Sequence, residues 1–182
     1  MIRIVGGTHR SRKLQMPENE SIRPTSDKLR QAVFNILEHR LNLHGKRVLD
    51  ACCGTGAMGL EALSRGAAEA VFMDNDKASI HYARTNAEML KEAAKCRFLQ
   101  CSVTAPPIGT PVDLLFLDPP YNKGLAESGL ATLTRAGWTG PDTLAFIEVA
   151  RDEVFTAPEG WTLDNERIHG AAKLLILLRA GA

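Results

Sequence analysis

Short apolar segments alternate with helical patterns along most of this chain, and this alternation constrains the fold more than any other feature. Five apolar segments have the length of strands: 46–51 (KRVLDA), 69–76 (EAVFMDND), 96–101 (CRFLQC), 112–118 (VDLLFLD) and 142–149 (DTLAFIEV). The segments between them predict helices over 58–64, 77–94 and 125–136. With two further strands near 160–168 and 172–179, we expect an α/β fold with a mostly parallel seven-stranded sheet and helices on both faces.

The N-terminal region has a different character. Residues 1–16 predict two short strands around Gly6-Gly7, which is a hairpin signal. A helix is expected from Thr25 or Ser26 to about residues 39–43, with Asp27 in its first turn. We therefore divide the chain into an N-terminal arm, residues 1–24, and a main domain, residues 25–182.

The arm is basic although the whole chain is nearly neutral. The net charge is +1, yet residues 1–13 contain no acid. Their charged residues are Arg3, Arg10, Arg12 and Lys13, with His9 among them. A local basic arm predicts contact with a polyanion. The alternative is a solvated charged terminus.

Composition excludes several classes of protein. The chain has 182 residues, of which 45% are hydrophobic and 24% charged, as in a globular protein with a substantial core. It has no apolar run of about 20 residues and no apolar signal core. The four cysteines form no C-x-x-C pair and no histidine pattern completes a zinc site. We expect a cytoplasmic protein with reduced thiols, no metal and no membrane segment; a monomer is favoured, although the sequence does not fix the oligomeric state.

A glycine-rich loop follows the first predicted strand of the main domain. Gly54-Thr-Gly56-Ala-Met-Gly59 matches G-x-G-x-x-G and opens a helix, so its backbone can approach a ligand closely. Asp74 ends the next strand, 20 positions after Gly54, where a carboxylate can bind a ribose diol. Together they predict an adenosine-containing cofactor. The alternative is a tight turn without a ligand.

Asp50 distinguishes between two such cofactors. It lies just before the loop, where a carboxylate would repel the pyrophosphate of a dinucleotide but attract an amino group or a sulfonium. We therefore expect S-adenosylmethionine rather than NAD.

Four motifs together resemble one family. The segment "DACCGTGAMG" resembles the cofactor motif of class I S-adenosylmethionine-dependent methyltransferases, and "DPPY" at 118–121 that of enzymes that methylate exocyclic nitrogens. With "RIVGGTHRSRKL" and "RPTSDKLRQAVFNIL", the chain resembles the bacterial 16S rRNA (guanine-N2)-methyltransferase family, the RsmD-like enzymes. The match is nearly end to end and is weakest after Arg151. It implies a Rossmann-like class I methyltransferase fold and methylation of a guanine in small-subunit rRNA.

The resemblance also implies roles for individual residues. Around the cofactor, Asp50, Gly54 and Gly56 would line the amino-acid and sulfonium side, and Asp74 the ribose, with Asn75 beside it. Ser102 would lie near adenine, although related enzymes often carry Asp or Asn there. Cys52 would pack beside the loop. Arg23, Thr25 and Arg30 would belong to a segment that folds over the pocket and contacts the substrate. Arg23 could instead contact the cofactor carboxylate, and the alternative for Arg30 is a surface charge.

The Asp118–Tyr121 corner suits methyl transfer to an amine. Asp118 and the carbonyl of Pro119 can each accept an N–H hydrogen bond from the amine, and these bonds strengthen as positive charge develops on nitrogen. Tyr121 can stack on the base. Pro119 and Pro120 stiffen the corner and supply no competing donor. The target should be a loop or flipped nucleotide, within rRNA or an assembling 30S subunit.

Other functions remain open from the sequence. A DNA adenine-N6 enzyme usually adds a recognition domain, and a protein glutamine-N5 enzyme usually has Asn before the two prolines. An NAD-dependent oxidoreductase would use the glycine loop but leave Asp50 and the Asp-Pro-Pro-Tyr corner unexplained. A non-catalytic RNA-binding module would not need that corner.

Overall fold

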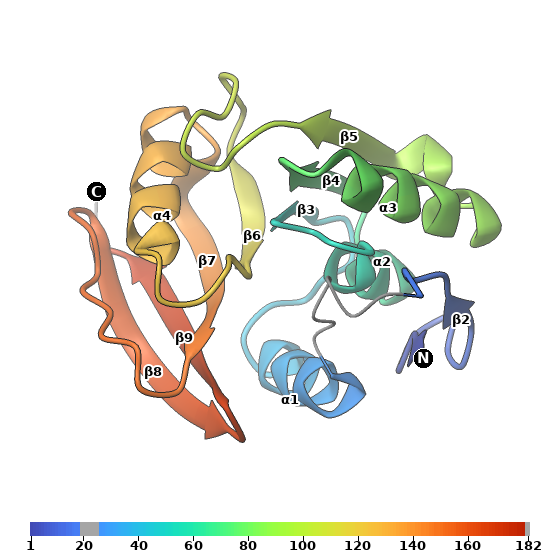
Figure 1. Ribbon diagram of the computed structural model, residues 1–182, viewed down its shortest axis with the longest axis horizontal. Helices are drawn as coiled ribbons and strands as arrows, with labels where there is room; N and C mark the ends of the chain where they lie inside the picture. Colours follow the sequence, from blue (N-terminus) through green and yellow to red (C-terminus); the bar gives the residue numbers. More distant parts are fainter. Residues whose placement is uncertain (19–25, 181–182) are drawn as a thin grey trace.

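A computed structural model describes residues 1–18 and 26–180 (Figure 1). The large sheet has the strand order β5 (Cys96–Gln100), β4 (Glu69–Asp74), β3 (Arg47–Ala51), β6 (Val112–Leu117), β7 (Thr139–Ala150), β9 (Ala172–Arg179), β8 (Trp161–His169). The helices are α1 (Asp27–Glu38), α2 (Ala57–Ser64), α3 (Lys77–Met89) and α4 (Leu125–Arg135), with a short 3-10 helix at Ala93–Lys95. β1 (Ile2–Arg3) and β2 (Lys13–Leu14) form a separate antiparallel hairpin. No helix in this described part of the chain is long and apolar enough to cross a membrane.

The sheet is parallel except at one end. β3, β4, β5, β6 and β7 are mutually parallel, and β9 runs antiparallel between β7 and β8. The chain builds β3, β4 and β5 toward one edge and then returns to place β6 on the other side of β3. Strand order therefore reverses between β3 and β6, and ligands of open α/β sheets bind beyond the carboxyl ends of the strands at such a point.

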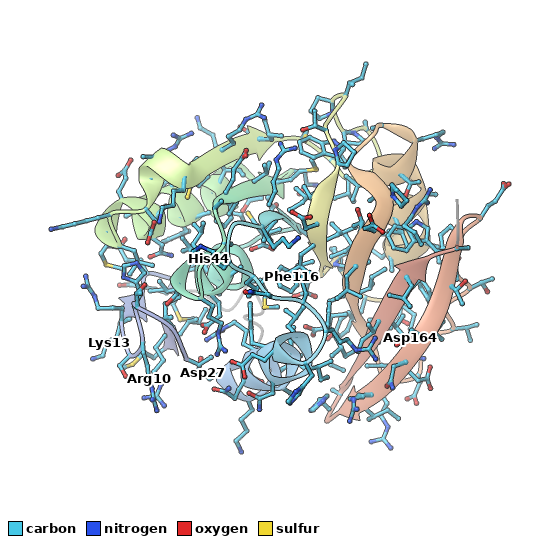
Figure 2. All side chains as sticks on the ribbon, turned by 180° about the vertical axis from the view of Figure 1, so that it is seen from behind. Arg10, Lys13, Asp27, His44, Phe116 and Asp164 are labelled. Atoms are coloured by element: carbon cyan, nitrogen blue, oxygen red, sulfur yellow. The ribbon has the colours of Figure 1, made fainter. Side chains whose placement is uncertain are left out.

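Alternate residues of each strand serve two hydrophobic clusters, because side chains alternate across a strand. Phe72, Phe116 and Phe146 pack with α1, α2, α3 and the hairpin, and Figure 2 places Phe116 at the centre of the molecule. Leu117 and Ile147 point to the opposite face and pack with α4. Figure 1 shows this division, with α4 on one side of the sheet and α1, α2 and α3 on the other. The predicted sheet with helices on both faces is confirmed.

The predicted hairpin is confirmed. Gly7, however, is needed for close packing against α2 and not for a tight turn. The hairpin packs on α2, with Ile2, Ile4 and Leu14 buried in the same cluster as Phe116. Gly7 has a φ of +73°, and a Cβ there would lie 1.9 Å from the carbonyl oxygen of Ser64. Only glycine allows the backbone to approach α2 this closely.

Element boundaries agree with the sequence patterns apart from two ends. Ser26 caps α1 by accepting a hydrogen bond from the Leu29 amide, so the helix begins where the sequence predicted. The helix predicted over 77–94 ends at Met89, because Lys91 adopts a left-handed backbone with a φ of +61°. The strand predicted from residue 142 begins at Thr139. A register shift against β6 between Val112 and Leu114 accommodates this extension.

Candidate active site

A cavity of about 720 Å³ lies at the point where strand order reverses. Its walls are the glycine loop after β3, the turn between β4 and α3, and the corner after β6, and they include Asp50 and Glu148. The cavity is within the size range of sites for small ligands and cofactors. The structure thus joins the two motifs that the sequence analysis singled out, the glycine loop and the Asp118–Tyr121 corner.

Two carboxylates hold the backbone of the glycine loop. Asp74 Oδ2 accepts a 2.9 Å hydrogen bond from the Gly54 amide, and Asp50 Oδ2 accepts one of the same length from the Gly59 amide. Gly59 also permits close packing of α2 on the sheet, since a Cβ there would lie 2.5 Å from the ring of Phe72. The loop is therefore held in place by the acids that were expected to contact the cofactor.

Asp50 is buried in an environment that disfavours its charge. It is 2% exposed. Burial raises its pKa to about 8; the Gly59 amide opposes this shift, and the nearby Asp74 adds to it. Burial also raises the pKa of Asp74, against the hydrogen bonds from the amides of Asp76 and Gly54. A ligand that brings positive charge would relieve both costs.

Turns and cysteines complete this side of the cavity. Asp76 caps α3 by accepting from the amides of Ala78 and Ser79, while Asn75 lines the cavity. Cys52 lines it as well, with a φ of +59°. Burial, followed by the charge of Asp74, raises the pKa of the Cys52 thiol well above its usual range. Such a thiol is a weak nucleophile, which agrees with a packing role.

The Asp-Pro-Pro-Tyr corner begins where β6 ends. The Asp118 amide donates to the carbonyl of Ala51 at 3.3 Å, which ties the corner to the end of β3. Pro119 is buried and Pro120 is exposed. The hydroxyl of Tyr121 donates a 2.5 Å hydrogen bond to Oε1 of Glu148 on β7. All four corner residues line the cavity.

Glu148 is the site residue that sequence analysis missed. It is 8% exposed and lies near the carboxyl end of β7, in the otherwise apolar segment Phe146–Val149. A single acid near the end of an apolar strand is the signal that also marks Asp50, Asp74 and Asp118. Applied to every strand, that signal would have found Glu148.

Strand register places the cavity acids on one face of the sheet. Asp50 pairs with Phe72 and Phe116, and Glu148 lies two residues after Phe146 on β7. Side chains in register on neighbouring parallel strands share a face, so these acids are on the side of α1, α2 and α3. The lining contains five carboxylates: Asp50, Asp74, Asp76, Asp118 and Glu148. Within residues 1–18 and 26–180, it contains no Lys, Arg or His.

Two residues expected at the cofactor are not part of the cavity wall. Gly56 is the N-cap of α2, with a φ of +80°, and packs against Ala83 and Phe72. The Ser102 hydroxyl bonds to the hydroxyl of Thr104 at 2.8 Å. Neither belongs to the described lining. Gly56 shapes the loop rather than facing the cavity, and Ser102 is not brought to it.

The residues predicted to contact RNA differ in their exposure. Arg3, Arg10, Arg12 and Lys13 are exposed, and Figure 2 shows Arg10 and Lys13 at the hairpin edge of the molecule. Arg3 also pairs with Asp27 at 3.2 Å. His9 is half-buried and its Nε2 lies 2.7 Å from Glu92 Oε1, so it holds the hairpin to the body. Arg23 and Thr25 lie outside the described residues.

The prediction that Arg30 contacts RNA is corrected by the structure. Its side chain is fully buried beneath the hairpin. It donates to the carbonyl of Arg3 at 2.5 Å and to Asp27 Oδ1 at 2.6 Å. An arginine enclosed in this way fastens the hairpin to α1 and is not accessible to RNA.

Asn86 of α3 connects the hairpin to the glycine loop. Its side chain is fully buried. Its Oδ1 accepts from the Gln15 amide at 2.7 Å, and its Nδ2 donates to the carbonyls of Gln15 and Thr55, each at 3.0 Å. Since Thr55 lines the cavity, the end of the hairpin is one side chain away from the cavity wall.

Comparison with known proteins identifies the family. Residues 2–178 match the model of the family described as Conserved hypothetical protein 95. The chain belongs to this family. The match confirms the resemblance that the four motifs indicated.

Relatives in the family are similar over nearly their whole length. The chain is 36% identical over 172 residues to "Ribosomal RNA small subunit methyltransferase D" of Escherichia coli (strain K12), covering 93% of this chain and 85% of the relative. The protein of the same name in Haemophilus influenzae is 33% identical over 174 residues, covering 93% of this chain and 89% of the relative.

Solved structures confirm the predicted Rossmann-like class I methyltransferase fold. The structure of yhhF from Escherichia coli, provisionally described as a methyltransferase, superposes with a TM-score of 0.87 at 33% identity, covering 100% of this chain and 99% of that chain. An RNA methyltransferase from Salinibacter ruber, solved with S-adenosyl-L-homocysteine, shares the fold at a TM-score of 0.67 and 14% identity, covering 87% of this chain and 95% of that one.

Proposed function

We propose that the protein transfers a methyl group from S-adenosylmethionine to the exocyclic N2 amine of a guanine in small-subunit rRNA. One observation carries the proposal: the Asp118–Tyr121 corner and the glycine loop are walls of the same acid-lined cavity. The names of the family relatives support rRNA of the small subunit as the substrate.

The charge of the cavity supports this cofactor over a dinucleotide. S-adenosylmethionine carries a sulfonium and an ammonium, and the described lining offers five carboxylates without a basic side chain. The pyrophosphate of NAD would enter this field against repulsion. In this proposal Asp74 binds the ribose diol, and Asp50 faces the positively charged side of the cofactor. Bound here, S-adenosylmethionine would supply an electrophilic methyl group.

The residues of the corner hold and orient the amine. Asp118 and the Pro119 carbonyl accept its two N–H groups, which directs the nitrogen lone pair toward the methyl carbon. Both acceptors stabilise the positive charge that develops on nitrogen, and Asp118 takes the proton that is released. The ring of Tyr121 stacks on the base while Glu148 fixes its hydroxyl at 2.5 Å.

The hairpin brings RNA to this corner. Arg3, Arg10, Arg12 and Lys13 present positive charge to phosphates, which supplies affinity with little sequence preference. Arg23 and Thr25 complete the contact in this proposal. Residues 1–24 thus act as the RNA-contacting unit and residues 25–182 as the transfer domain. The target is a loop or flipped guanine in cytoplasmic rRNA, naked or within a partly assembled 30S subunit.

The experiment is a methyl-transfer assay with tritiated S-adenosylmethionine. Naked small-subunit rRNA and small subunits, both lacking the modification, are offered in parallel, and the product is mapped by nuclease digestion. Label in N2-methylguanine at one position is expected. Label in N6-methyladenine, or none in either substrate while S-adenosylmethionine still binds, would contradict the proposed substrate.

A further inference from the structure

Glu148 is the cavity acid for which methyl transfer alone has no direct use. Asp118 and the Pro119 carbonyl suffice to hold an amine, and Asp50 and Asp74 face the glycine loop. Glu148 belongs to a different strand, β7, yet the residue is only 8% exposed and lines the same cavity.

Strand register places Glu148 beside Asp118. Leu117 of β6 is in register with Ile147 of β7. Glu148 is the next residue of β7 and Asp118 is the first residue after β6, so both directly follow a pair of residues whose backbones are level and about 5 Å apart. A base whose exocyclic amine is bound at Asp118 therefore presents the neighbouring part of its edge to Glu148.

That edge distinguishes guanine from adenine. In guanine, two ring nitrogens flank the N2 amine, and the one on the Watson–Crick edge is N1, which carries a proton. In adenine, the ring nitrogen beside the exocyclic amine is N1 without a proton, an acceptor. Enzymes that extrude a base identify it by hydrogen bonds to this Watson–Crick edge. A carboxylate accepts from the N1–H of guanine and repels the N1 lone pair of adenine.

We propose that Glu148 is the specificity-determining residue that selects guanine, by accepting the N1–H of the target base while Asp118 holds its N2 amine. The inference rests on the proposed function and names the group that chooses the base. The hydroxyl of Tyr121 fixes the carboxylate from the side, because it donates to Oε1 at 2.5 Å. A carboxylate has two oxygens with about four acceptor positions, so this bond and one from a base are compatible.

The test uses substrates that differ at N1. Small-subunit rRNA is prepared with guanine, 2-aminopurine or 6-thioguanine at the position found by the mapping experiment, in the assembly state that the wild type methylates. All three bases have the 2-amine. 2-Aminopurine lacks the N1 proton, whereas 6-thioguanine keeps it and controls for the altered 6-position. The measured quantity is kcat/KM for wild type, Glu148→Gln and Tyr121→Phe.

Wild type should favour guanine over 2-aminopurine by about 100-fold or more, since a buried charged acceptor loses its partner. It should accept 6-thioguanine within about tenfold of guanine. In Glu148→Gln the amide can donate to the bare N1, so discrimination against 2-aminopurine should fall to about tenfold or less. Tyr121→Phe keeps the stacking ring but removes the hydrogen bond that fixes the Glu148 carboxylate, so it should reduce the discrimination, and by less than Glu148→Gln does.

Two results would overturn the inference. One is a wild type that methylates 2-aminopurine as well as guanine; the other is Glu148→Gln with the discrimination of the wild type. If Glu148→Gln turned over neither substrate, its affinities for the guanine and 2-aminopurine RNAs would be measured by competition binding. The ratio of these affinities would then replace the ratio of kcat/KM values in the same comparison with wild type. Failure of the proposed function can be told apart from failure of this inference, because in the first case the wild type would methylate no guanine at all.

Discussion

The protein buries charge in two regions on the same face of its sheet, and the two are built in opposite ways. Beneath the hairpin, charges are paired. Glu61 is fully buried; its oxygens accept from the amides of Val5 and Gly6 at 2.8 and 2.7 Å, and Arg65 Nε lies 3.0 Å away. In the cavity, like charges gather: Asp50, Asp74, Asp118 and Glu148 line one space.

The difference separates a structural device from a binding one. A buried carboxylate with donors on both oxygens holds two segments together, and removing it leaves its partners uncompensated. In the cavity, burial raises the pKa values of Asp50 and Asp74, so their charged forms cost folding free energy until a positively charged ligand arrives. Substitutions in the paired region should therefore reduce stability, and substitutions in the cavity should reduce function without that loss.

The largest effect is expected at Asp118. Asp118→Ala should lower the methyl-transfer rate by about 10³-fold, because a group that stabilises developing charge is lost. Affinity for S-adenosylmethionine should stay unchanged in calorimetry. Asp142→Ala, which removes an exposed acid at the opposite end of the sheet, is the matched control. Activity retained in Asp118→Ala would remove this residue from the catalytic role.

The next effect is on stability, at Glu61. Glu61→Gln should lower the free energy of unfolding by about 3–5 kcal/mol, because Arg65 and the fully buried Arg30 each lose a buried acid and keep the more exposed Glu38 and Asp27. Urea denaturation measures the loss. Asp164→Asn is the control: Asp164 pairs with Arg40 at 2.6 Å with both side chains 31% exposed, and should cost less than about 1 kcal/mol. Equal losses in the two variants would show that the buried position of Glu61 does not make its ion pairs more important for stability than an exposed pair.

Asp50 should respond in the opposite direction. Its folded pKa of about 8 exceeds the ordinary 3.8, so the folded protein holds this proton more tightly than the unfolded chain. The resulting stability is fully present below about pH 4 and is lost as pH rises through 8. Asp50→Asn avoids this loss, so the ligand-free variant should melt several degrees higher than wild type at pH 8.

The same substitution should weaken S-adenosylmethionine binding by about 10- to 100-fold, the value of a charged hydrogen bond. Wild-type affinity should fall as pH is lowered from 7.5 to 6, since Asp50 must then lose a proton to bind a cation. The variant should show no such dependence. If Asp50→Asn had a lower melting temperature than wild type and an unchanged affinity for S-adenosylmethionine, Asp50 would be a structural residue like Glu61.

The smallest effect is expected on the exposed hairpin. Replacing Arg10, Arg12 and Lys13 together by Ala should weaken RNA binding at low salt. The slope of log K against log salt should fall by about two to three, as expected for three phosphate contacts. Arg167→Ala on the edge strand β8, away from the hairpin in Figure 1, should not change the slope. An unchanged slope in the triple variant would place the RNA elsewhere.

Most of the fold and part of the site could be predicted because their signals are local. Asp50, Asp74 and Asp118 were found since each ends an apolar strand next to a turn marked by glycine, proline or another acid. Glu148 is also an acid near the end of an apolar strand, but it has no turn marker beside it, because β7 continues to Ala150. The sequence could therefore nominate Glu148, whereas its place beside the corner depends on register with β6, which no single strand reveals.

Arg30 shows the opposite error, because the sequence predicted a substrate-contacting residue where the structure has a buried structural one. Its neighbours in sequence suggested a substrate-facing segment, but its environment is set by Arg3 and Glu61, 27 and 31 positions away. The fate of a charged side chain on an amphipathic helix depends on what covers that helix. Here the cover is the hairpin, which the sequence predicted as an element but not as a lid on α1 and α2.

The Asn86 bridge has a consequence for anyone who wishes to redirect the enzyme to another RNA. The hairpin looks like an appendage that could be exchanged between relatives. Its end, at Gln15, is however hydrogen-bonded to the side-chain amide of Asn86, which also donates to the carbonyl of Thr55. A transplanted hairpin would have to bring a backbone that satisfies Asn86, Glu61 and Ser64, or the recipient's cofactor loop would lose a support. The unit to transplant is therefore the hairpin together with its dock on α2 and α3.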